Sequence, residues 1–484
     1  MPPKYSLTEG SIPRALAAFS LPILFGNMLQ SLNGSVNAVW VGKFLGEAAL
    51  AAAGNSNVVM FLLFGVIFGF SMASTVMIAQ CIGAKNIAEA KRVVGTSAVF
   101  FMAVSLAMSV VGFVSAPGLL GWMQTPADAM PFALAYMRII FLALPFMSGM
   151  FFLMAALRGA GDSRTPFIYL VVSVILDIGL NPLFIFGLGP IPRLGIAGAA
   201  TATLIAQALS CGALIAHLYR TKHFLRIRRH ELELFKVDWT LVRLLISKGI
   251  PMGLQMFVVS SSMIAVVSLV NRFGSQETAA FNAAMQLWNY VQMPAMAVGA
   301  AVSSMAAQNV GAGRWDRVGK VAITGVTFNF VVGGSLIVLV YLLGRHALAL
   351  FLPSTGAAID ISVHLNAVVL WSFILFGTSF VLFGVVRATG AVMAPLIMLI
   401  ISLWFVRLPF AYLMLDRWHA DAIWWSFPFA SIVSAALATL YYRYGGWRNV
   451  HLGIAEKRPS TPSGAEAETA TAASIATPTS TPTA

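Results

Sequence analysis

Carboxylates are the side chains of this sequence whose placement could do chemistry. Of the 17 Asp and Glu residues, sixteen fall in expected termini, connections or helix rims, and Asp177 alone lies deep within a long apolar run. An ionisable group in such a run is costly and is by default a functional candidate. Because burial disfavours the charged form of a carboxyl group, Asp177 could take up a proton from one side of a barrier and release it to the other. The alternative is a packing role, in which Asp177 pairs with an arginine or accepts hydrogen bonds.

Side-chain amides recur at helical spacing, both beside Asp177 and in other apolar runs. Asn181 follows Asp177 by four residues and therefore shares its helical face, and Pro182 comes directly after it. Amides facing lipid would be costly, so we expect the amide stripes to face a wet cavity, with interhelical hydrogen bonding as the alternative. The candidates for ion coupling or substrate binding are Asp177, Asn181 and Asn37. The candidates for lining a cavity are Gln30, Asn33, Gln255, Asn282, Gln286, Asn289, Met293 and Arg407.

The composition excludes an ordinary soluble protein. Of the 484 residues, 59% are apolar and 10% are charged, whereas soluble domains have about 45–50% apolar and about 25% charged residues. So few charges cannot coat a chain of this length, and the bilayer is the natural solvent. The net charge of +13 would suggest a nucleic-acid partner in a soluble protein, so it needs another explanation here.

Twelve apolar runs are long enough to span a bilayer. They cover about 15–40, 50–80, 93–115, 131–156, 165–188, 195–219, 246–270, 279–309, 318–343, 361–386, 394–415 and 420–442. The termini and even-numbered connections carry 23 Lys and Arg residues against five in the alternate connections, which predicts that both termini are cytoplasmic. The positive charge therefore orients the helices and meets anionic lipid, and we expect a multi-pass inner-membrane protein without a nucleic-acid partner.

The chain contains an internal duplication. Matching segments recur in order at a spacing of 228 or 229 residues: Pro22 with Pro251, QCIGAK from Gln80 with QNVGAG from Gln308, and RGAGDSRTP from Arg158 with RATGAVMAP from Arg387. Six spans per copy place both copies in the same orientation, related by a pseudo-two-fold axis along the membrane normal. The fold class is thus an all-α polytopic membrane protein with two six-helix bundles, and rocking of the bundles would give alternating access.

This repeat divides the chain into five parts. We expect a cytoplasmic N-terminus at 1–14, a first bundle at 15–219, a basic linker at 220–245, a second bundle at 246–443 and a cytoplasmic tail at 444–484. The tail is rich in Ser, Thr, Pro and Ala and is expected to be disordered from about residue 456.

Several motifs, taken together and in order, resemble a known family. They are VNAVWVGKFLGEAALAA, QCIGAK, ALRGAGDSRTP, ILDIGLNPLFIFG and LGIAGAATAT in the first half, and QNVGAG and RLPFAYLM in the second. The sequence is similar in these to prokaryotic multidrug and toxic compound extrusion (MATE) transporters over about residues 10–445. The resemblance implies twelve helices in two bundles and export of amphipathic, often cationic compounds against inward flow of protons or sodium ions.

The sequence also departs from that family's pattern. Members commonly show Asn then Asp where this chain has Asp177 then Asn181, and they usually have an acid where this chain has Asn37. Sodium favours several hard oxygen ligands including carboxylates, so one acid among amides favours protons as the coupling ion. Arg407 and Arg138, the other charges inside spans, could pair with Asp177 or with a substrate, or reach the interface.

Other functions find less support. The resemblance also admits a flippase for lipid-linked precursors, a channel remains an alternative, and an enzyme is not expected because none of the seven His residues forms a catalytic or metal-binding motif. The two Cys residues, Cys81 and Cys211, lie beside apolar runs and suit packing. We therefore expect a monomeric antiporter with a small amphipathic substrate, a proton or sodium ion as coupling ion, no cofactor and no metal site.

Overall fold

A computed structural model describes residues 7–187, 192–349 and 357–454, and every regular element in these residues is a helix. The predictions for the first six residues and for the tail from 455 lie outside the described part of the chain. The first half contains α1 (Ile12–Leu45), α2 (Glu47–Gly83), α3 (Ile87–Trp122), α4 (Met130–Gly159), α5 (Arg164–Phe186) and α6 (Ile196–Arg220). The second half contains α7 (Trp239–Val270), α8 (Ser275–Gly311), α9 (Trp315–Leu348), α10 (Ala357–Val369), α11 (Ser372–Arg387), α12 (Met393–Ile400), α13 (Leu408–Trp418) and α14 (Ala420–Tyr444), with η1 (Arg229–Phe235), η2 (Asn271–Phe273), η3 (Ile401–Arg407) and η4 (Gly446–Asn449) as short elements.

The helices match the twelve predicted spans, but two spans are composite. Among the described residues, ten helical segments are long and apolar enough to cross a membrane, and the pair α10 and α11, bent by 48°, forms an eleventh. Their break coincides with a hydrogen bond from the Ser372 hydroxyl to the Val369 carbonyl at 2.7 Å, which competes with the helical pattern. The span from Met393 to Trp418 contains the π-helix η3. The predicted eighth span corresponds to α8, which is not among these eleven because its polar amides lower its mean hydropathy.

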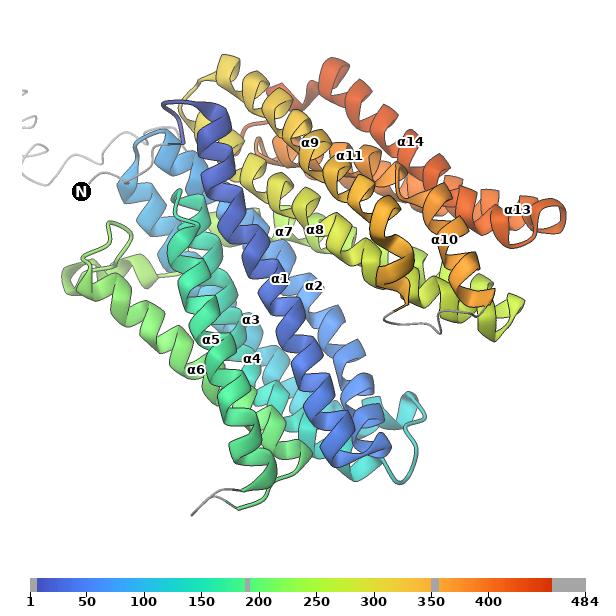
Figure 1. Cartoon of the computed structure of the whole chain (residues 1–484). Helices are drawn as coiled ribbons and strands as arrows, with labels where there is room; N and C mark the ends of the chain where they lie inside the picture. The colour runs from blue at the N-terminus through green and yellow to red at the C-terminus, as the bar shows by residue number, and fades with distance from the viewer. Residues whose placement is uncertain (1–6, 188–191, 350–356, 455–484) are drawn as a thin grey trace, which may run out of the picture.

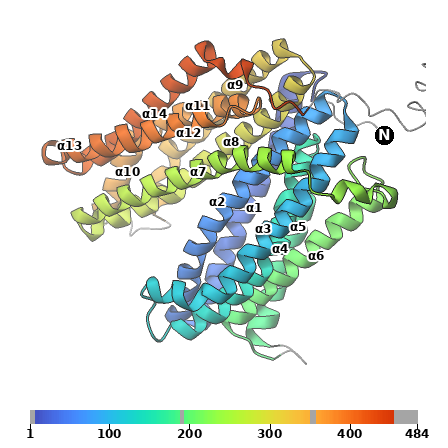
Figure 2. The same cartoon turned by 180° about the vertical axis from the view of Figure 1, so that it is seen from behind.

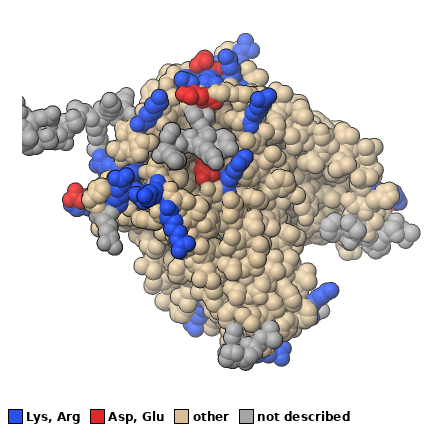
Figure 3. Space-filling model, turned by 60° about the vertical axis from the view of Figure 1, so that its left-hand side comes forward, with Lys and Arg blue, Asp and Glu red and all other residues tan. Residues whose placement is uncertain are grey.

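Two bundles diverge from one end of the molecule. Figures 1 and 2 show α1–α6 on one side and α7–α14 on the other, close together near the start of α1 and apart at the opposite ends of the helices. Contacts between the halves are made mainly by α1 and α2 with α7 and α8. We call the end formed by the connections 84–86, 160–163, 221–238, 312–314 and 388–392 the closed end, and the opposite end the open end. Figure 3 shows Lys and Arg gathered at one end of a largely uncharged surface.

Glycine lets α2 and α7 touch. A Cβ atom on Gly69 of α2 would overlap the backbone of Gly249 and Gly253 of α7. Gly65 and Gly69, and likewise Gly249 and Gly253, are four residues apart and thus share a helical face. Small residues at this spacing allow the close backbone packing that joins helices in membranes. The backbones of the two halves therefore approach closely at this crossing, where the Phe70 ring also packs against Gly249.

The basic linker is docked rather than free. Lys91 and Arg92 of α3 form ion pairs of 2.7 Å with Glu231 and 2.6 Å with Asp238. Asp238 also accepts a hydrogen bond from the Thr240 amide at 2.9 Å, which caps α7 and starts it at Trp239, before the predicted start of the span at 246. The linker thereby ties the beginning of the second half to α3 of the first half.

We predict that Gly69→Ala lowers the free energy of unfolding by about 1–3 kcal/mol, because the added methyl group overpacks the crossing of α2 with α7. The midpoint of thermal unfolding in detergent measures the effect. Gly54→Ala is the matched control, since a Cβ there meets nothing within 4 Å and alanine favours a helix over glycine. Equal unfolding midpoints for the two variants would contradict the close contact.

We predict that the Lys91–Glu231 pair loses its contribution in acid. The hydrogen bond from Lys91 holds the pKa of Glu231 below its usual value of 4.5. A carboxyl group with a lowered pKa in the folded state stabilises that state above its unfolded pKa and stops doing so as the pH falls through the folded value. The difference in unfolding midpoint between the wild type and Glu231→Gln should therefore shrink below about pH 4.5. Glu233→Gln, which removes only an exposed pair with Lys236, should show no such difference at any pH.

Candidate functional site

Asp177 is buried at the middle of the first bundle. Its exposed fraction is 3%, and among the described residues no other Asp or Glu is buried. It lies 13 residues into α5, about 20 Å along the axis from Arg164 at a rise of about 1.5 Å per residue. This depth places the carboxylate far from both ends of the helix, where bulk water could solvate it.

Neighbouring helices supply hydrogen bonds in place of water. The side-chain amides of Asn33 and Asn37 on α1 each donate to Asp177 Oδ2 at 2.9 Å. The hydroxyl of Thr203 on α6 donates to Oδ1 at 2.9 Å. Hydrogen bonds from several donors stabilise a carboxylate that burial would otherwise penalise. The site therefore joins α1, α5 and α6 around one negative charge.

Asn181 completes the cluster through a second set of contacts. Its Nδ2 donates to Asn37 Oδ1 and to the Asp177 backbone carbonyl, both at 2.8 Å. Because Asn37 accepts from Asn181 and donates to Asp177, these contacts fix the orientation of its amide. The oxygens Asn33 Oδ1 and Asn181 Oδ1 are buried and have no hydrogen-bond partner. These oxygens can each accept a hydrogen bond or contact a cation.

The structure thus brings together Asp177, Asn181, Asn37 and Asn33, and it adds Thr203, which the sequence reasoning missed. Thr203 lies 26 residues after Asp177 on the small-residue segment of α6. Threonine is common in such segments, so the sequence alone does not mark Thr203 as a partner of Asp177. The packing of α5 on α6 supplies the missing information.

The second half buries two arginines, Arg387 and Arg407, and none of its described Asp or Glu residues. Arg407 has an exposed fraction of 6%, and its guanidinium carbon lies 3.6 Å from the ring centroid of Phe427. One of its terminal nitrogens is 3.8 Å from Met263 Sδ, and its Nε has no hydrogen-bond partner. Its contacts therefore lie within the second half, and no ion pair with Asp177 occurs among the described residues. Arg138 is half-buried over Phe113 at 5.1 Å, so neither arginine pairs with the acid.

The remaining candidates lie away from the Asp177 cluster. Gln255 is buried and accepts a hydrogen bond from Arg387 at 3.1 Å, so it serves packing inside the second half. Met293 is half-buried, and the exposed amides are Gln30, Asn282, Gln286 and Asn289. These four lie on α1 and α8, the helices that come together between the halves. Among the described residues no group of three His, Cys, Asp or Glu side chains could hold a metal ion.

Comparison with known proteins identifies the family. The MatE family model matches residues 22–183 and 251–413, two segments that begin at the paired prolines of the internal repeat. The probable multidrug resistance protein YoeA of Bacillus subtilis is 36% identical over 439 residues, which cover 90% of this chain and 95% of that protein. A protein of Shewanella oneidensis named FAD transporter is 24% identical over 332 residues, which cover 68% of this chain and 72% of that protein.

Solved structures agree with the fold. A multidrug resistance MATE family transporter in an outward-facing conformation superposes with a TM-score of 0.82 at 20% identity, covering 90% of this chain and 96% of that one. The twelve spans in two bundles, the duplicated halves and the family match over both halves lead to one conclusion. This chain belongs to the multidrug and toxic compound extrusion (MATE) family of membrane transporters.

Proposed function

We propose that the protein is a secondary antiporter that exports amphipathic, cationic compounds in exchange for protons by alternating access. The observation that carries this proposal is the single buried carboxylate, Asp177, held by donors from α1 and α6. A group that alternates between a charged and a neutral form can bind a proton in one state of the cycle and a cationic compound in another. The similarity to YoeA, named a probable multidrug resistance protein, supports a drug-like substrate.

Protons suit the contacts of Asp177 better than sodium ions. Both carboxylate oxygens already accept hydrogen bonds from amide and hydroxyl groups, whereas sodium binding needs oxygen atoms turned toward the ion. The two unpartnered amide oxygens, on Asn33 and Asn181, are acceptors for the hydroxyl that Asp177 gains on protonation. A proton therefore requires small rotations within the cluster, and a sodium ion requires its rearrangement.

The basic connections orient the molecule. The closed end carries most of the Lys and Arg residues of the connections, which favours a cytoplasmic position for this end and for both termini. The halves of this structure are then apart on the external side, where Asp177 would meet protons from outside. Each half, 15–219 and 246–443, would move as a unit in a monomer within the inner membrane.

Each ligand must favour a different state for exchange to occur. Protonation removes the negative charge of Asp177 and weakens the charge-assisted bonds to Asn33, Asn37 and Thr203. A cationic compound would instead keep Asp177 ionised. Competition for this one charge couples the two flows without requiring that both ligands bind at once.

Arg407 favours a second candidate, a substrate that carries an acidic group. A buried guanidinium without an anionic partner is costly, and an acidic group on the substrate would pair with it. The relative named FAD transporter supports acidic substrates within this family. A flippase for lipid-linked precursors with acidic head groups remains the alternative of this type.

We predict that Asp177→Asn abolishes proton-driven transport in proteoliposomes, reducing it to the level of empty vesicles, because the variant retains no titratable group in the cluster. Ethidium is a suitable cationic probe. The double variant Asp177→Asn with Asn37→Asp is the matched test, since these side chains are 2.9 Å apart and exchanging them keeps one carboxyl group in the cluster. Transport by the double variant should return to within about tenfold of the wild type. Proton-driven transport by Asp177→Asn at the wild-type rate, with the same elution in size-exclusion chromatography, would refute the role of Asp177.

We predict that an imposed proton gradient drives ethidium export and that an imposed sodium gradient at constant pH does not. The physical reason is that both carboxylate oxygens of Asp177 already accept hydrogen bonds, which a sodium ion would have to displace. Fluorescence of the trapped dye in vesicles of defined lipid measures both fluxes with the same protein preparation. Export driven by sodium alone would identify sodium as the coupling ion and overturn the proton assignment.

A further inference from the structure

Two glutamines occupy equivalent positions in the two halves at the closed end. Gln80 lies near the end of α2 and Gln308 near the end of α8, and their exposed fractions are 4% and 3%. They open the repeated motifs QCIGAK and QNVGAG, which are 228 residues apart. The transport chemistry at Asp177 does not use them, so their burial at the contact between the halves needs another explanation.

Each glutamine donates a hydrogen bond to the opposite half. Gln80 Nε2 lies 2.7 Å from the carbonyl oxygen of Ala388 at the end of α11. Gln308 Nε2 lies 2.8 Å from the carbonyl oxygen of Gly159, the last residue of α4. The two bonds are thus related by the internal repeat, with donor and acceptor exchanged between the halves.

The acceptors are carbonyls that their own helices leave without a donor. The last carbonyls of an α-helix have no intrahelical partner, and a buried carbonyl without a hydrogen bond is costly. Gln80 and Gln308 satisfy one such carbonyl each, at the end of a helix in the other half. Separation of the halves would break both bonds together.

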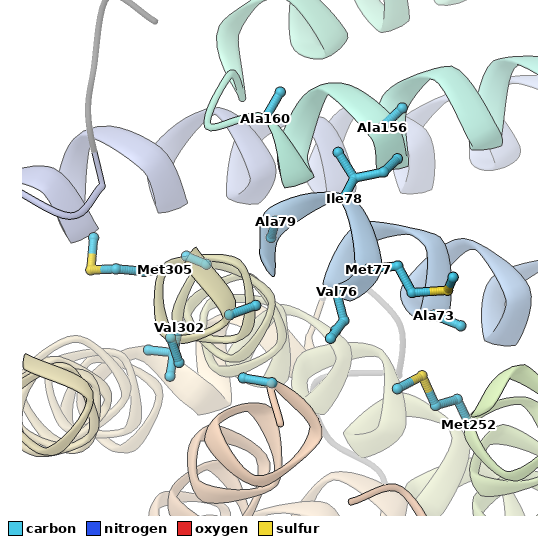
Figure 4. Close-up of a cluster of buried hydrophobic side chains, with 14 of the residues drawn as sticks. Ala73, Val76, Met77, Ile78, Ala79, Ala156, Ala160, Met252, Val302 and Met305 are labelled. Carbon is cyan, nitrogen blue, oxygen red and sulfur yellow. The ribbon is translucent and has the colours of Figure 1, made fainter. Parts of the chain in front are cut away.

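Glycine brings the two glutamines within reach. A Cβ atom on Gly83 would overlap the backbone carbonyl of Gln308, and a Cβ atom on Gly311 would overlap that of Gln80. The helices α2 and α8 therefore cross with their backbones in contact. The surroundings are apolar: Figure 4 shows α2 lying between Val302 and Met305 of α8 and Ala156 and Ala160 at the end of α4.

We propose that Gln80 and Gln308 are positioning residues that form a reciprocal latch, which holds the closed end shut and is released each time the transporter opens there. This proposal rests on the alternating access proposed above. The latch differs from a fixed core contact because cytoplasmic water can replace each bond once the halves part. A net hydrogen bond changes an equilibrium by about two- to tenfold, enough to bias the cycle without blocking it.

The test measures distances across both ends of the full-length protein in lipid nanodiscs. Spin labels on cysteines replacing Arg220 and Lys320 report the closed end, and labels replacing Lys43 and Arg272 report the open end; all four residues are exposed. The native Cys81 and Cys211 are buried, and protein without added cysteines controls for their labelling. Electron–electron resonance distances recorded at several pH values then give the ratio of the two states.

The variants remove the donor and retain the length of the side chain. We expect Gln80→Met and Gln308→Met each to raise the ratio of closed-end-open to closed-end-shut molecules by about two- to tenfold, and the double variant to raise it further. The closed-end distance should lengthen while the open-end distance shortens. Because Gln80 and Gln308 belong to different halves, a local loss of packing in one half would not make both variants lengthen the closed-end distance and shorten the open-end distance.

Asn329→Leu is the matched control. Asn329 is a buried amide that donates to the Ile374 carbonyl at 3.0 Å within the second half, so its loss removes a similar bond that does not join the halves. Unchanged ratios in both glutamine variants, or the same shift in Asn329→Leu, would overturn the latch while leaving the proposed function intact. A wild-type protein whose closed-end distance never changes with pH or with ethidium would instead overturn alternating access, and the latch with it.

Discussion

A carboxylate buried in an apolar bundle must obtain from the protein the hydrogen bonds that water would supply. This requirement for Asp177 determines much of the first half, because Asn33, Asn37 and Thr203 must approach from two other helices. The helices α1, α5 and α6 are therefore held together by polar contacts at mid-depth as well as by apolar packing. Any change in the charge of Asp177 alters the forces among the three helices at once.

The contact between the halves depends on a different device. Near the closed end the crossing helices approach through glycine rather than through interlocking large side chains: Gly69 with Gly249 and Gly253, and Gly83 and Gly311 beside the two glutamines. Close backbone approach at these glycines brings Gln80 and Gln308 within hydrogen-bond distance of carbonyls in the opposite half. Small residues at such crossings allow helices to pack closely in membranes, and here they bring the two halves into contact.

The sequence was sufficient for most of the architecture and for part of the site. Apolar runs and the repeat predicted twelve spans in two bundles, since burial in lipid leaves a strong signal in most spans, and the repeat supports α8, whose polar stripe weakens that signal. The helical spacing of Asp177 and Asn181, and of Asn33 and Asn37, was equally readable. Spacing within one helix does not reveal which helix lies opposite, so Thr203 could not be found and Gln255 could not be recognised as a partner of Arg387. The bend between α10 and α11 was not predicted either, because it involves a serine hydroxyl and no proline.

Duplication explains why the halves match in some respects and differ in others. The latch residues occur in both copies at a constant spacing, and a contact across a pseudo-two-fold axis needs both copies to keep the same residues. Some charges do not follow this rule: Arg158 and Arg387 match in the repeat, but Asp177 in the first half and Arg407 in the second have no counterpart of the same charge. A symmetric acid would give each bundle its own carboxyl group, whereas one acid gives, in the proposed cycle, a single group for which proton and substrate compete. In the proposed cycle the symmetric residues therefore control the motion, and the asymmetric ones give it a chemical drive.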